Sequence, residues 1–94
     1  MKFISKEIID LLLYRIQQEQ YGSKVYESMA LWLANESYMN CAKVWKKFAD
    51  EELEHAELAK EYLLSFNVMP ELMKIEEPPN AFTSLEDIIQ KTFD

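Results

Sequence analysis

The sequence contains little that would interrupt a helix. Its 94 residues include one glycine, Gly22, and three prolines, and no proline precedes Pro70. Glycine and proline are the residues that most disfavour a helix interior. Almost nothing in the first two thirds of the chain would therefore end a helix, and long helices are the simplest expectation.

Cysteine, basic residues and long apolar runs are also scarce. The single Cys41 excludes an intrachain disulfide, and its apolar setting indicates a buried thiol in a reducing compartment. Ten Lys and Arg against seventeen Asp and Glu give a net charge of -7, which disfavours nucleic acids and anionic membranes as partners. Lys6, Glu7 and Asp10 interrupt any signal-peptide core, and no apolar run reaches the roughly 18 residues of a membrane span. We expect a cytoplasmic protein.

What the sequence has in abundance is apolar side chains. It is 49% hydrophobic, with five Tyr, five Phe, two Trp and five Met. A chain of this size buries about two thirds or less of its unfolded surface, and a lone helical hairpin buries less well still. Some of this apolar surface should therefore be covered by another chain.

The apolar residues recur at helical spacing in two long segments. We expect helices over about 5–35 and 38–66, with Ser5 as the N-cap of the first and Asn67 closing the second. The short polar connection at 35–37 requires the two helices to run antiparallel.

A third, shorter helix is expected over about 84–93. Thr83, with Glu86 three residues later, predicts a capping box at its start, and the prolines before it indicate an irregular crossing segment. The predicted fold is all-α: one domain over residues 1–94, made of an antiparallel hairpin plus a short C-terminal helix.

Three ionisable residues fall at unexpected places in the apolar pattern. Glu19 lies in the inward row of the first helix, while Glu52 and His55 lie one turn apart in the inward row of the second. Buried carboxylates need a positive partner, and an i, i+3 Glu–His pair can reach one divalent ion. Oxygen and nitrogen ligands of this kind suit iron or manganese, and also zinc.

Two simpler explanations compete with a metal site. Glutamate-rich helices produce the E-x-x-H spacing by chance, and a lone histidine on an apolar face is often a hydrogen-bonded core residue. The third residue, Glu19 on a facing helix, favours the metal site because buried clusters of ionisable groups tend to be functional.

The chain resembles the ferritin family in three stretches. They are EQYGSKVYESM from Glu19, ADEELEHAE from Ala49 and PPNAFTSLEDIIQKTF from Pro78, which resemble the first two helices, the crossover and the start of the third helix of bacterial ferritins. The resemblance implies that Glu19 is a terminal iron ligand, that Glu52 bridges two irons, and that His55 binds the first. It also implies that Tyr26 lies beside the iron centre and that Glu51 binds a further iron.

A ferritin draws its second set of iron ligands from its third and fourth helices, and this chain stops before those positions. It resembles a truncated ferritin with half a site. Two copies would supply Glu19, Glu52 and His55 twice, which is the ligand set of a di-iron helical bundle, so we expect dimerisation to complete both the bundle and the site. Two-helix encapsulated ferritins resemble this arrangement.

The expected function is therefore oxidation of Fe(II) to Fe(III) with dioxygen, in iron storage or detoxification, by a homodimer or higher homo-oligomer. A non-catalytic assembly module remains the alternative, as does a ferritin fragment that needs another polypeptide to complete its site.

Overall fold

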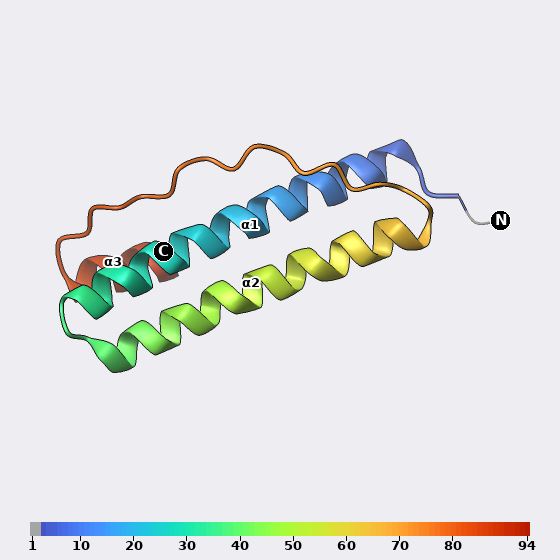
Figure 1. Cartoon of the computed structure of the whole chain (residues 1–94). Helices are drawn as coiled ribbons and strands as arrows, with labels where there is room; N and C mark the ends of the chain where they lie inside the picture. Colours follow the sequence, from blue (N-terminus) through green and yellow to red (C-terminus); the bar gives the residue numbers. More distant parts are fainter. Residues whose placement is uncertain (1–2) are drawn as a thin grey trace.

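The computed structural model describes residues 3–94 as a helical hairpin carrying a shorter third helix. The helices are α1 (Lys6–Asn35), α2 (Met39–Ser65) and α3 (Leu85–Phe93). Helices α1 and α2 run antiparallel along the length of the molecule, whose extents are 54 × 20 × 20 Å (Figure 1). The all-α hairpin with a short C-terminal helix is confirmed.

Local hydrogen bonds set the start of α1 and the turn after it. Ser5 caps α1, because its Oγ accepts the N–H of Ile8 at 3.2 Å. At the other end Ser37 takes a left-handed φ of 69°, and the N–H of Tyr38 reaches the carbonyl of Leu33 at 2.8 Å. This closure satisfies a carbonyl of the last turn and sends the chain directly into α2.

Asn67 ends the second helix as the sequence predicts. Its φ of 59° is left-handed, a conformation that asparagine tolerates better than most residues. The N–H of Val68 then bonds the carbonyl of Leu63 at 3.0 Å.

The crossing segment, residues 68–83, returns along α1 to the far end of the hairpin (Figure 1). Side chains of α1 hold it there by bonding its carbonyls. Gln17 donates to Lys74 at 2.7 Å and Ser28 donates to Pro79 at 2.7 Å. These two bonds fix an extended segment that has no regular secondary structure.

The start of α3 differs by one residue from the expected capping box. Ser84 is the N-cap, and its Oγ accepts the N–H of Asp87 at 3.0 Å. Asp87 reaches back to the N–H of Thr83 at 3.1 Å. The prediction of Thr83 and Glu86 as the capping pair is wrong, because the neighbouring Ser–Asp pair forms the reciprocal bonds instead.

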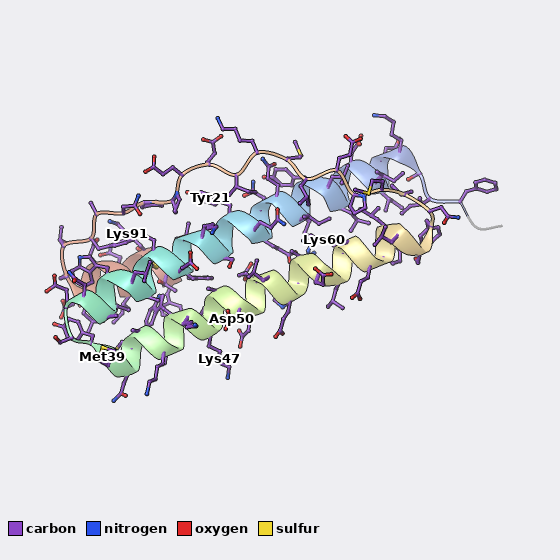
Figure 2. All side chains as sticks on the ribbon, in the orientation of Figure 1. Tyr21, Met39, Lys47, Asp50, Lys60 and Lys91 are labelled. Carbon is purple, nitrogen blue, oxygen red and sulfur yellow. The ribbon has the colours of Figure 1, made fainter. Side chains whose placement is uncertain are left out.

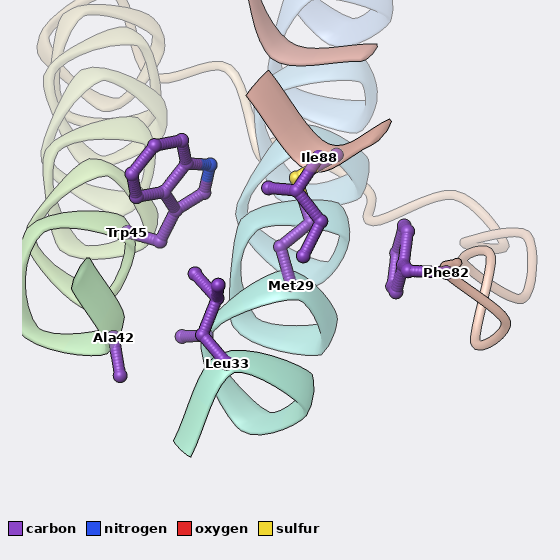
Figure 3. Close-up of a cluster of buried hydrophobic side chains, with 7 residues drawn as sticks. Met29, Leu33, Ala42, Trp45, Phe82 and Ile88 are labelled. Carbon is purple, nitrogen blue, oxygen red and sulfur yellow. The ribbon is translucent and has the colours of Figure 1, made fainter. Parts of the chain in front are cut away.

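Two apolar clusters hold the helices together. The cluster near the 36–38 turn joins all three helices and the crossing segment (Figure 3), and its buried members are Met29, Ala30, Leu33, Ala42, Trp45, Phe82 and Ile88. The second cluster lies toward the opposite end of the hairpin and contains Ile16, Ala56, Ala59 and Leu63. Its members come from α1 and α2 alone, so α3 supports only one half of the molecule.

Much apolar surface remains uncovered, including side chains at the open end of the hairpin. Leu11 and Leu58 are each 65% exposed, and Ile8 and Tyr62 are about half exposed. Charged side chains such as Lys47 project from α2 away from α1 (Figure 2). No helix in the described part of the chain is long and apolar enough to cross a membrane.

Candidate metal centre

Glu19 is a buried carboxylate with one paired and one unpaired oxygen. Its side chain is 9% exposed, and its Oε1 accepts a hydrogen bond from Arg15 Nε at 2.6 Å. Its Oε2 is buried and has no hydrogen-bond partner among the described residues. A buried acceptor left unpaired costs about 1–3 kcal/mol, so a hydrogen-bond donor or a cation at this oxygen would stabilise the folded chain.

Glu52 extends from α2 toward the next turn of α1 after Glu19. Its Oε2 lies beside Gly22, where an added Cβ would be 3.4 Å from that oxygen. The Glu52 carboxylate therefore packs against α1 at Gly22, with space there for a methyl group but not for a large side chain. Because Gly22 is three residues after Glu19, the two carboxylates belong to adjacent turns of the interface between α1 and α2.

A shallow cavity of about 210 Å³ opens beside Glu52 and is lined by Tyr26, Phe48, Glu51, Glu52, Thr92 and Phe93. Tyr26 is half-buried, and its ring lies 5.6 Å from that of Phe48. Glu51 is exposed at the edge. The expected neighbours Tyr26 and Glu51 thus share one cavity with Glu52, and the end of α3 forms part of its wall.

His55 is exposed in the single chain, although the sequence pattern predicts an inward side chain. The prediction of burial is wrong for this residue because no element of the described chain covers that part of α2. Within residues 3–94, no group of three His, Cys, Asp or Glu side chains is close enough to hold one ion. The isolated hairpin brings Glu19 and Glu52 to one interface and leaves His55 at its edge.

Two residues next to the candidate ligands are not identified by the sequence analysis. Arg15 pairs with Glu19, and Gly22 lies beside the Glu52 carboxylate. A signal for each exists in the sequence: Arg15 precedes Glu19 by four residues, and Gly22 is the one glycine in the chain. Neither signal identifies its partner without the packing of α2 against α1.

The fit of a cation to these residues rests on donor chemistry. Carboxylate oxygens and an imidazole nitrogen suit divalent transition metals, and the unpaired Glu19 Oε2 is an available oxygen donor. Fold and donor set together define a class of protein: two-helix hairpins that carry carboxylates, here Glu19 and Glu52, at the interface between their helices.

Comparison with known proteins identifies the family within that class. A family model described as a ferritin-like domain matches residues 9–94, and the chain belongs to the ferritin family. The bacterial non-heme ferritin of Campylobacter jejuni is 32% identical over 91 residues, covering 97% of this chain and 54% of that protein.

Two further relatives show nearly the same coverage. The bacterial non-heme ferritin of Escherichia coli O6:H1 is 26% identical over 90 residues, which is 96% of this chain and 54% of the relative. A probable bacterial non-heme ferritin-like protein of Haemophilus influenzae is 26% identical over 91 residues, 97% of this chain and 55% of the relative. The chain spans about half the length of the curated relatives it matches.

Proposed function

We propose that this chain binds Fe(II) and oxidises it to Fe(III) with dioxygen at a di-iron centre shared between subunits, in iron storage or detoxification. Glu19, Glu52 and His55 are the proposed iron ligands, with Tyr26 beside them and Glu51 as a ligand for an additional iron. The observation that carries the proposal is the buried, unpaired Oε2 of Glu19, because a cation would relieve its unfavourable burial.

Membership of the ferritin family supports iron as the metal, since relatives are named non-heme ferritins. Anionic carboxylate ligands stabilise the more highly charged Fe(III) relative to Fe(II). They therefore favour the oxidation of bound Fe(II). Manganese or zinc would accept the same donor atoms. We also propose that the protein is cytoplasmic, as the sequence leads us to expect.

A second copy of the chain is the proposed source of the remaining ligands. One side of the hairpin is left uncovered beyond α3, and we call its residues Ile8, Leu11, His55, Leu58 and Tyr62 the open face. Their common side follows from helical spacing. Tyr26 on α1 and Glu51 on α2 line one cavity. The open-face residues of each helix are reached from these two by steps of three, four or seven residues, and such steps keep side chains on one face of a helix. Pairing of two open faces would cover apolar side chains and bring two His55 residues toward the shared centre.

Helix α3 restricts this pairing. It already packs against the half of the hairpin next to the 36–38 turn, and Phe93 at its end reaches the cavity beside Glu52. We therefore propose that a second hairpin makes its contacts through the open face, where α3 does not lie.

The test is anaerobic Fe(II) titration of the metal-free protein, followed by exposure to oxygen, with molar mass measured by light scattering before and after. We expect two irons per dimer at the shared centre, apart from the additional iron at Glu51, and rapid oxidation. Glu52→Ala should abolish paired binding, whereas Glu54→Ala, which changes an exposed glutamate two residues away, should not. Stoichiometric oxidation retained by Glu52→Ala would contradict the proposal.

A non-catalytic assembly module is the second candidate, favoured by the exposure of His55. It predicts dimers that form equally well without metal and that tolerate substitution of Glu52 and His55. Absence of iron binding at an unchanged dimer mass would support it.

A further inference from the structure

Arg15 and Glu19 form an asymmetric ion pair in the middle of α1. The Arg15 side chain is 68% exposed, whereas that of Glu19 is 9% exposed. The contact uses Nε of the guanidinium and Oε1 of the carboxylate, at 2.6 Å. Side chains in a helix lean toward its N-terminus, so Glu19 leans toward the turn that carries Arg15.

We propose that Arg15 is a positioning residue for the metal: it holds Oε1 of Glu19 so that Oε2 is presented to the ion. This inference rests on the proposed function, because it assigns a role at the same centre. Arg15 would not contact the metal. It would fix the side-chain conformation of the ligand that does.

The bonding pattern favours positioning over simple neutralisation of charge. An arginine that neutralises a carboxylate commonly uses two parallel N–H donors, one to each oxygen. Here one oxygen is held and the other is left buried without a partner. Ligating carboxylates are typically fixed by such outer hydrogen bonds, and loss of the outer partner typically weakens metal binding by about 10–100-fold.

The opposite role would be competition, in which Arg15 occupies Glu19 until a metal displaces it. A competing cation should bind the oxygen that the metal needs, and its removal should tighten metal binding. The guanidinium is mostly exposed, so solvent screens its repulsion toward an incoming ion. Its hydrogen bond to Oε1 ends on the buried partner of the pair, which favours the positioning role.

The two roles separate in a pair of substitutions. Arg15→Met removes charge and hydrogen bond, whereas Arg15→Gln removes the charge but retains an N–H donor of similar reach. Positioning predicts that Arg15→Met weakens binding by about tenfold or more, while Arg15→Gln restores it to near the wild-type value. Competition predicts tighter binding in both variants.

The experiment is titration of the metal-free full chain with Co(II) and Zn(II), with the Co(II) absorption spectrum recorded at saturation. The matched control is Lys24→Met, which removes an exposed α1 cation that lies 3.6 Å from Glu27. We expect this control to bind as the wild type does. An altered Co(II) spectrum in Arg15→Met that is restored in Arg15→Gln would report a change in ligand geometry. Thermal unfolding of the metal-free variants checks that both remain folded.

Each outcome decides the inference. Wild-type affinity in Arg15→Met, or tighter binding in both Arg15 variants, overturns the positioning role and leaves the proposed function standing. Failure of the wild-type chain to bind Co(II), Zn(II) or Fe(II) overturns both. Weak binding in Arg15→Met with recovery in Arg15→Gln supports both.

Discussion

Oε2 of Glu52 lies beside Gly22, so that a Cβ at this glycine would be 3.4 Å from the carboxylate oxygen. Glycine inside a helix costs about 1 kcal/mol relative to alanine. Gly22→Ala should therefore raise the free energy of unfolding by up to about 1 kcal/mol, since its added methyl group just fits. Gly22→Leu should displace the Glu52 carboxylate and weaken Co(II) binding more than Gly22→Ala does.

Chemical denaturation measures the first effect, and metal titration of the two variants measures the second. Equal metal affinity in Gly22→Leu and the wild type would mean that Glu52 does not need its place beside α1.

Thr92 anchors α3 to the hairpin through the indole of Trp45. Trp45 Nε1 donates to Thr92 Oγ1 at 2.9 Å, and Trp45 is buried. Thr92→Val keeps the shape of the side chain but leaves the indole N–H unpaired, which should lower the free energy of unfolding by about 1–3 kcal/mol. Thr92→Ser retains the acceptor and is the control. A loss of stability in Thr92→Ser as large as that in Thr92→Val would assign the effect to the lost methyl group instead.

Acid should weaken the N-terminal cap of α3 through Asp87. The N–H of Thr83, and then Lys91 at 3.0 Å, hold the pKa of the Asp87 carboxyl below its ordinary value of 3.8. Because the folded pKa is the lower one, the stabilisation is complete above pH 3.8 and is lost as the pH falls through the folded pKa. The indole N–H NMR signal of Trp45 should follow this loss, since Trp45 contacts α3 at Thr92.

The control for this effect of acid is Asp87→Asn, which removes the ionisation and keeps an oxygen acceptor. Its Trp45 signal should change less between neutral pH and pH 3 than that of the wild type. An identical acid response in both proteins would assign the change to other carboxyls.

The helix ends show what local sequence can and cannot predict. Ser5 and Asn67 were predictable because each is a favoured cap next to a long periodic segment. At α3 the sequence offers two adjacent candidates, Thr83 and Ser84, each with an acid three residues later. Local propensity cannot separate them, and in the structure Ser84 is the cap.

Some features of the candidate site could also be predicted from the sequence, and others could not. The burial of Glu19 follows from the periodicity of one helix, but its bond to Arg15 depends on a side-chain conformation that the sequence does not specify. The exposure of His55 could not be predicted, because burial of that part of α2 depends on elements outside the hairpin. Sequence periodicity identifies an inward row; it does not identify what covers that row.

The open face gives the most direct test of pairing between hairpins. Leu58 lies three residues after His55 on α2 and is 65% exposed. If two open faces pack together, Leu58→Glu places a charge in an apolar contact, so the dimer should dissociate. Leu64→Glu is the matched control: Leu64 is 53% exposed on the same helix, but a six-residue offset turns it well away from Leu58. Light scattering across a range of protein concentrations should show a lower molar mass for Leu58→Glu alone.

Iron binding should fall when the dimer dissociates, because each hairpin would then hold only its own half of the ligand set. A monomer that still binds two irons would require both sets of ligands to come from one chain, whereas loss of the dimer only in Leu64→Glu would move the interface to the other side of α2.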